Sequence, residues 1–248
     1  MSGHSKWATI KHKKGAADKA RGKLFAKLAR QIEVAARAGG GDVDSNAALR
    51  TMVLKAKAGQ MTKDAIDRAI KRGIGENDGA NYETIVYEGY APGGVAMLVD
   101  TLTDNRNRTA SDVRTAFSKF GGSLAEPGAV GWQFSRRGVV LVDGSLDEDT
   151  VMSAALEAGA EDIERDGDSW RVLTDSSVVY DVKDALESAG IAVQSAESTM
   201  VSSTTIEVTD IEDAKQILRI MDMLEDNDDV QDVYANFDID DAMMQELG

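Results

Sequence analysis

Cationic side chains crowd the first residues of the chain around one large aromatic residue. The stretch GHSKWATIKHKKG, residues 3–15, holds six lysine or histidine side chains and one tryptophan. Ammonium groups at this density suit contact with nucleic-acid phosphates, and the tryptophan could stack on an unpaired base or pack against the protein. The candidate contact residues here are Lys6, Trp7, Lys11, His12, Lys13 and Lys14.

A predicted helix over residues 16–38, ended by three glycines, continues this cationic surface. At about 100° per residue its positive residues fall within about 80° of one another, opposite its apolar residues. A solubilising surface would usually interleave acids, but only Glu33 lies nearby, so phosphate binding is favoured. The positive residues are Lys19, Lys23, Lys27, Arg30 and Arg37, and the apolar ones are Leu24, Phe25, Leu28, Ile32 and Ala35.

Charge is distributed unevenly along the chain. Residues 1–80 hold 17 Lys and Arg against 8 Asp and Glu, whereas the other 168 residues hold 11 against 35, and the formal net charge is -15. A basic head on an acidic body predicts that the head alone meets a polyanion and that the body is repelled by it.

Amino-acid composition excludes several classes of protein and of chemistry. A chain of 248 residues that is 42% hydrophobic is expected to be globular, and it has no apolar run of the roughly 18 to 20 residues that a membrane span needs. We therefore expect a cytoplasmic protein that does not enter a membrane. The absence of cysteine excludes thiolate chemistry, and both histidines lie in the basic head, so we assign no catalytic residue, metal or cofactor and predict that the chain is not an enzyme.

Periodicity and turn residues predict an α+β multidomain fold. Two short helices, over 46–58 and from a Thr62 cap to Arg72, complete a three-helix domain at 1–78. Next come a hairpin (84–87 and 95–101), a helix from Thr109, a strand at 130–134 and a turn at 135–138. Strands and helices then alternate as βαββαβ from 139 to 199, before a strand at 204–208, a helix at 211–224 and a strand at 230–237.

We interpret this order as two ferredoxin-like α/β domains, the third domain being inserted in the second. The second would comprise 79–135 plus 203–240, and the acidic third 136–202. The same order of strands and helices also fits an alternative in which the domains are contiguous in sequence, with no insertion.

A polar stretch, Thr101–Thr109, is predicted as a loop between a strand and a helix N-terminus. Its Asn105, Arg106 and Arg108 could bind phosphate there, or the asparagine could satisfy turn amides while the arginines pair with acids of the body. Acids at 226–232 lack the glycine and the fifth-position oxygen ligand of a calcium loop, so we assign no metal to them.

Four stretches, GHSKWATIKHKKG, KLFAKLARQIEVAAR, YEGYAPGGV and TDNRNRTASDVRTAFSKFGG, resemble the YebC/PmpR family of probable transcriptional regulators. Mitochondrial members resemble translational activators of cytochrome oxidase synthesis. The resemblance implies three domains, no enzymatic activity, and either DNA binding or action on translation at the ribosome, including at proline-rich stretches. The chain departs from the family pattern at Gln60–Thr62, where an Asn-Met-Pro segment is expected, and at Val43, where a proline is expected.

Two hypotheses follow. In the first, the basic head grips DNA and the chain regulates transcription, with RNA polymerase as a further partner. In the second, the head holds ribosomal RNA and the chain is a translation factor, which accounts for an acidic body kept away from phosphate. The oligomeric state is left open.

Overall fold

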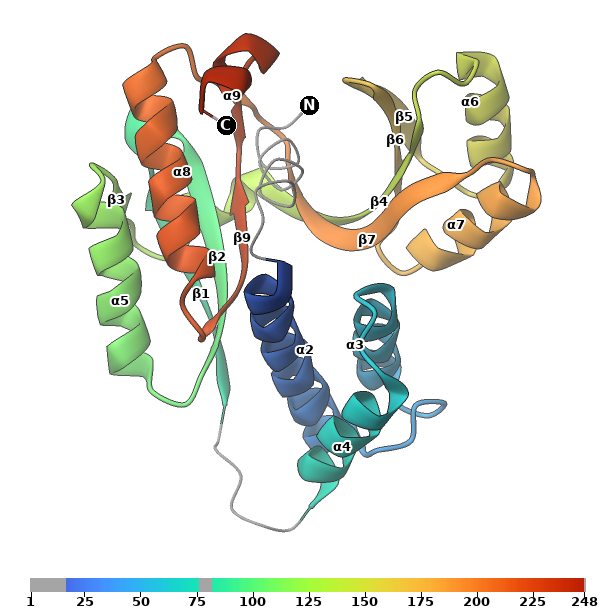
Figure 1. The fold of residues 1–248 in the computed structure, drawn as a ribbon, viewed down its shortest axis with the longest axis horizontal. Coiled ribbons are helices and arrows are strands. Elements are labelled where there is room, and N and C mark those ends of the chain that lie inside the picture. The colour runs from blue at the N-terminus through green and yellow to red at the C-terminus, as the bar shows by residue number, and fades with distance from the viewer. Residues whose placement is uncertain (1–16, 76–81, 248) are drawn as a thin grey trace.

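The computed structural model describes residues 17–75 and 82–247, which form three units, each with its own hydrophobic core (Figure 1). We call residues 17–75 the helical unit, residues 82–133 together with 203–247 the second unit, and residues 134–202 the third unit. In the part of the chain that is described, no helix is both long enough and apolar enough to cross a membrane.

The helical unit consists of α2 (Ala17–Gly39), α3 (Ala47–Ala58) and α4 (Lys63–Ile74). Asn46 and Thr62 cap α3 and α4, because their side chains accept hydrogen bonds from the first-turn amides of Leu49 and Ala65. Thr62 thus starts a helix at the position where the resemblance implied a proline. The core joins the three helices through Leu28, Ile32, Leu49, Val53 and Ile66. Leu24, predicted on the packed side of the first helix, is instead 42% exposed.

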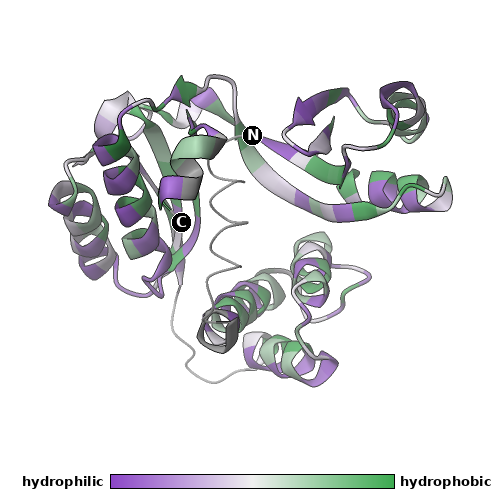
Figure 2. Cartoon of the chain, turned by 45° about the horizontal axis from the view of Figure 1, so that its top comes forward, coloured by the Kyte–Doolittle hydropathy of each residue, from purple (hydrophilic) through white to green (hydrophobic). Residues whose placement is uncertain are grey.

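The second unit is built on an antiparallel sheet of order β3-β1-β2-β9. These strands are β1 (Glu83–Tyr90), β2 (Ala96–Thr103), β3 (Ser123–Leu124) and β9 (Val230–Ala235). Helices α5 (Arg106–Lys119) and α8 (Ile211–Glu225) pack on one face, where Phe117, Ile217 and Met221 are fully buried. Figure 2 shows hydrophilic residues on the outward sides of these two helices, at the left of the view.

Two short strands and a last helix complete this unit. β8 (Ile206–Glu207) pairs in parallel with β10 (Phe237–Asp238), and α9 (Asp241–Leu247) follows. The prediction that this unit is ferredoxin-like is wrong, because the hairpin β1–β2 precedes its first helix, whereas a βαββαβ unit places a helix directly after its first strand.

The third unit contains β4 (Phe134–Asp143), α6 (Glu148–Glu157), β5 (Asp162–Asp166), β6 (Ser169–Thr174), α7 (Val179–Ser188) and β7 (Val193–Ser202). Its antiparallel sheet has the order β5-β6-β4-β7, which is the strand order of a split βαββαβ unit. The predicted turn at 135–138 is wrong. These residues continue β4, because β7 pairs with them along their whole length.

The predicted strand at 130–134 is replaced by a 3₁₀ turn, Gly131–Gln133, in a loop that lies on the sheet of the second unit. The carboxylate of Glu88 on β1 accepts hydrogen bonds from the amides of Gly128, Val130 and Gly131, at 2.6–2.7 Å. Desolvation alone would raise the pKa of Glu88, but these three bonds outweigh it and lower the pKa. The conformation of this loop is therefore fixed by the carboxylate of Glu88, which is distant from it in sequence.

The second and third units share a small core on the sheet face opposite α5 and α8. Leu98 and Tyr234 of that sheet contact Val130 and Phe134, and Met200 near the end of β7 packs against them. The chain passes between the two units at this core, once into β4 and once out of β7.

Candidate nucleic-acid interface

The N-terminal candidates Lys6, Trp7, Lys11, His12, Lys13 and Lys14 lie outside the described residues. Lys19 belongs to α2, but its side chain is not among those described. The geometry of the predicted interface therefore begins at Lys23.

The positive side of α2 faces the second unit. Lys23 Nζ lies 2.7 Å from a carboxylate oxygen of Asp226, and Lys27 Nζ donates to the backbone carbonyl of Glu225 at 2.9 Å. Arg30, one turn further along, donates to the carbonyls of Leu102 and Asp228 at 3.2 and 3.0 Å. Three residues predicted from the sequence to bind phosphate thus contact the carboxyl end of α8 or the residues that follow it, and Figure 1 shows α2 running beside the second unit.

Burial has changed the chemistry of Lys27. Desolvation lowers the pKa of its ammonium group, although the nearby carboxylates of Glu225 and Asp232 oppose the shift. Lys27 has therefore given up part of its hydration for contacts within the chain.

Asp229 is the polar centre of this contact. Its side chain is only 8% exposed, and its two oxygens receive Arg30 at 3.2 Å and Arg108 at 2.8 Å. The hydroxyls of Thr103 and Thr109 donate to the same carboxylate at 3.2 and 2.8 Å. Burial by itself would raise the pKa of Asp229, but the bonds from Arg108 and the threonines outweigh it, so the pKa is lowered.

The predicted 101–109 loop is shorter than expected, because α5 begins at Arg106 rather than Thr109. Asn105 is the cap of this helix, its side chain accepting from the Arg108 amide at 3.1 Å. Arg108 pairs with Asp104 and Asp229, and Arg106, whose side chain is 71% exposed, lies 3.9 Å from Glu83. These residues therefore make the capping and ion-pair contacts that were the alternative to phosphate binding, and Arg106 is the more exposed of the two arginines, at 71% against 48% for Arg108.

A second ionic contact lies on the sheet itself. Asp100 of β2 and Asp232 of β9 are register partners, and each faces a cation from another unit: Arg136 lies 3.8 Å from Asp100, and Lys55 of α3 lies 3.3 Å from Asp232. Desolvation and the charge of Asp232 raise the pKa of Asp100. Like charges directly opposite on two strands are unfavourable unless cations offset them, so the three units meet where two carboxylates need neutralising.

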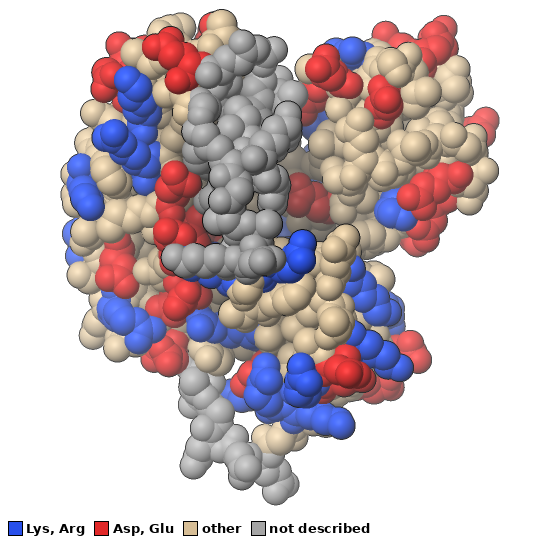
Figure 3. All heavy atoms as spheres, viewed as in Figure 1, with Lys and Arg blue, Asp and Glu red and all other residues tan. Residues whose placement is uncertain are grey.

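The outer surface of the helical unit carries cations that the sequence analysis did not select. Among the described residues these side chains have no ion pair, and all are exposed: Lys57, Lys63, Arg68 and Lys71. Figure 3 shows Lys and Arg gathered at the lower end of this unit. The spacing of Arg68, Lys71 and Arg72 at i, i+3 and i+4 places them on one helix face, a signal that could have identified them.

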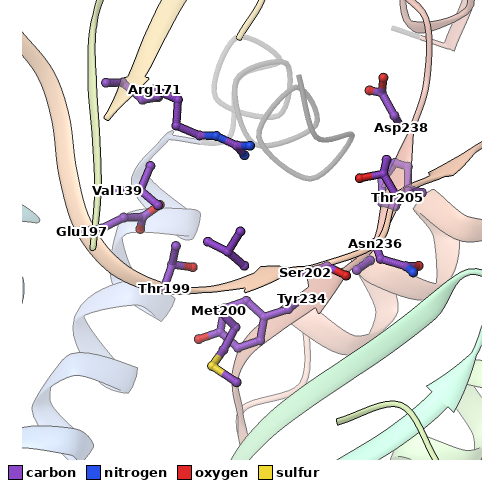
Figure 4. Close-up of a pocket in the computed structure, with 14 residues that line it drawn as sticks. Val139, Arg171, Glu197, Thr199, Met200, Ser202, Thr205, Tyr234, Asn236 and Asp238 are labelled. Carbon is purple, nitrogen blue, oxygen red and sulfur yellow. The ribbon is translucent and has the colours of Figure 1, made fainter. Parts of the chain in front are cut away.

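A cavity of about 240 Å³ lies between the second and third units. Figure 4 shows Arg171 of the third unit and Asp238 of the second on opposite sides of it, with Tyr234 and Met200 at its floor. Burial raises the pKa of Tyr234, so its phenol stays protonated. The described lining residues include no histidine, cysteine or lysine, and within the described ranges no group of three or more His, Cys, Asp or Glu side chains could hold a metal ion.

Comparison with known proteins identifies the chain. A family model described as the TACO1/YebC protein N-terminal domain matches residues 5–76, and one described as the TACO1/YebC second and third domain matches residues 82–237. A protein of Beutenbergia cavernae named probable transcriptional regulatory protein is 57% identical over 100% of this chain and 99% of its own, and one of Rubrobacter xylanophilus with the same name is 56% identical over the same shares.

A solved structure agrees with the fold. The crystal structure of a conserved hypothetical protein from Aquifex aeolicus is 42% identical, superposes with a TM-score of 0.76, and is matched over 89% of this chain and 91% of that one. The chain matches both family models in sequence order, and its relatives align with it from end to end. It therefore belongs to the TACO1/YebC family.

Proposed function

We propose that this chain regulates gene expression by binding nucleic acid through its helical unit and the basic segment that precedes it. The names of its relatives, probable transcriptional regulatory proteins, support the regulatory role. DNA is the first proposed target.

The observation that carries the proposal is the separation of charge between folded units. The helical unit holds 13 Lys and Arg against 6 Asp and Glu, whereas the third unit holds 5 against 15. Because a polyanion attracts the first and repels the second, only one side of the molecule can approach a phosphate backbone closely.

The exposed cations of α3 and α4 are the described part of this surface. The side chains of four cations are exposed and form no ion pair among the described residues: Lys57, Lys63, Arg68 and Lys71. Asp64 and Asp67 share the outer side of α4, so the local field is weaker than the count of cations suggests. We therefore assign the larger share of the phosphate contacts to Lys6, Lys11, Lys13 and Lys14 at the N-terminus, with Trp7 and His12 beside them.

Salt dependence tests this assignment. Removing one phosphate-binding cation reduces the slope of log K against log salt by about 0.7–0.9. Replacing Lys11, Lys13 and Lys14 by Ala should lower the slope for a random-sequence DNA duplex by about 2–3. Replacing Lys63, Arg68 and Lys71 should lower it by less, because the two acids on α4 already oppose binding there.

Lys119 is the matched control, because it is an exposed lysine on α5 of the second unit, away from the proposed surface. Lys119→Ala should leave the slope unchanged. Equal slopes in the wild type, the control and both triple variants would contradict the proposal.

The translation alternative rests on the acidity of the third unit, which a folded RNA can accommodate at its edge more easily than a long duplex can. Competition separates the two: labelled random duplex is displaced from the full-length protein by ribosomes or by promoter fragments at about 150 mM salt. Displacement by promoter fragments at lower concentration supports the DNA proposal, and displacement by ribosomes at lower concentration supports the alternative.

A further inference from the structure

We infer that the side of α2 bearing Lys23, Lys27 and Arg30 is a second polyanion-binding surface, which the segment 225–229 of the second unit covers, so that nucleic-acid phosphates and this segment compete for it. The inference rests on the proposed function, and it adds a surface that is closed in the structure described above.

The covering segment presents oxygens where phosphate oxygens would lie. At the carboxyl end of α8, the carbonyls of Glu225 and Asp226 accept from Lys27 and Lys23, and the Asp226 carboxylate adds a charge 2.7 Å from Lys23. A helix carboxyl terminus carries partial negative charge and therefore attracts cations as a phosphate does. Lys23, Lys27 and Arg30 stand at i, i+4 and i+7 along α2, so one helix side meets one anionic segment.

The contact is made of groups that can separate. The Asp226 side chain is 76% exposed and that of Lys23 is 31% exposed, and the pair Lys55–Asp232 is exposed by 39% and 35%. Exposed ion pairs contribute little and are weakened by salt. Figure 3 shows acidic side chains along the side of the second unit that faces the helical unit, so the contact is electrostatic at its rim.

Lys27 and Arg30 are both partly buried in this contact; Arg30 reaches the buried carboxylate of Asp229, and that carboxylate keeps its other partners without Arg30. Arg108 and two threonines still bind the carboxylate if α2 moves away. The second unit can thus release α2 and keep its own polar core satisfied, which a competing ligand requires.

Neutralising the rim of the covering side tests the competition. A variant carrying Asp226→Asn and Asp232→Asn loses the ion pairs to Lys23 and Lys55, and random duplex DNA should bind it about three- to tenfold more tightly than it binds the wild type. The salt slope should rise by about 2–3, as the three α2 cations reach phosphates.

The control must carry the same charge change elsewhere. Asp149→Asn with Glu157→Gln removes two exposed acids from α6 of the third unit, which have no ion pair among the described residues. Any gain caused by net charge alone appears equally in this control. Equal affinities of the control and the Asp226/Asp232 variant would overturn the inference.

Adding Lys23→Ala identifies the surface that is uncovered. In the wild type Lys23→Ala should change the affinity for DNA by less than about twofold, because Lys23 is already paired with Asp226. In the Asp226/Asp232 variant the same change should lower the affinity for DNA by about threefold or more. A gain that survives Lys23→Ala would show that the new contacts lie elsewhere and would overturn the inference.

A distance measurement gives an independent readout. The chain has no cysteine, so Ala48→Cys on α3 and Ser118→Cys on α5 place two labels on the full-length protein, one on each side of the contact. Their separation should increase when DNA is added, and an unchanged separation at saturating DNA would contradict the opening. Absence of DNA binding in every variant would instead refute the proposed function itself, whereas binding that depends on Lys11, Lys13 and Lys14 but not on the acids would refute the inference alone.

Discussion

Asp229→Asn is the sharpest test of how the helical unit is attached. The substitution keeps the size of the side chain and removes one of two carboxylate oxygens, each of which receives a guanidinium group: Arg30 on one and Arg108 on the other. Whichever way the amide turns, one arginine faces an N–H₂ group in place of an oxygen.

The hydrogen bonds that remain in the Asp229→Asn variant determine how much unfolding free energy is lost. Arg108 keeps Asp104 at 2.9 Å, and Arg30 keeps two backbone carbonyls and the ring of Tyr82 at 5.0 Å. The loss is therefore about one charge-assisted hydrogen bond in a buried site, or about 1.5–3 kcal/mol of unfolding free energy at pH 7. Asp226→Asn, at an exposed carboxylate of the same segment, should cost less than about 1 kcal/mol.

The pH dependence gives a second readout with a defined sign. The pKa of Asp229 is lowered below its ordinary value of 3.8, so its ionised form stabilises the folded state above that value and the contribution is lost as the pH falls through the folded pKa. The stability difference between wild type and Asp229→Asn should therefore be largest near neutral pH and shrink below about pH 4.

Urea unfolding between pH 3 and 7 measures these differences, and hydrogen exchange at the amide of Leu102, which donates to the Asp229 carbonyl at 2.8 Å, locates them. Equal stability of Asp229→Asn and wild type at pH 7 would refute the reasoning. A stability difference that stays constant down to pH 3 would refute the part of it that concerns ionisation.

Three further predictions concern the cores and the ionic junction. Gly73→Ala should destabilise the helical unit by about 1–3 kcal/mol in thermal unfolding, because the new Cβ would lie 2.4 Å from the Glu33 carbonyl oxygen, and Gly40→Ala is not a suitable control because its φ is +87°. Phe117→Ala empties the core of the second unit and should cost about 3–5 kcal/mol in urea unfolding, with a loss below about 1 kcal/mol arguing against this packing. Arg136→Ala removes the cation near Asp100 and should raise the pKa of that carboxyl further in an NMR titration, whereas an unchanged pKa would show that the 3.8 Å pair is ineffective.

Much of the local structure could be predicted from the sequence. The three helices of the helical unit were expected within about two residues, because caps such as Thr62 and C-terminal glycines such as Gly40 act through adjacent backbone groups. The βαββαβ order of the third unit was also readable, since strands and helices of ordinary length alternate there between turn residues.

The errors fall where a distant residue decides the backbone. The composition Ser-Arg-Arg-Gly predicts a turn at residues 135–138. These residues form a strand instead, because β7, about 60 residues further along the chain, supplies their hydrogen-bonding partners. The segment at 130–134 read as a strand, and the Glu88 carboxylate on β1 holds it as a loop. Neither β7 nor Glu88 is close in sequence to the segment that it contacts, so local composition could not predict either contact.

By itself the sequence determined the charge separation, the helical unit and the family, since these depend on residue types and short spacings. Only the tertiary structure decided which cations face solvent. Lys23, Lys27 and Arg30 look like a free phosphate-binding stripe on an isolated helix, yet the folded chain places the anionic segment 225–229 against them. Coulomb attraction acts between groups brought close in space, and about 200 residues of chain separate these partners, so no local pattern could reveal their pairing.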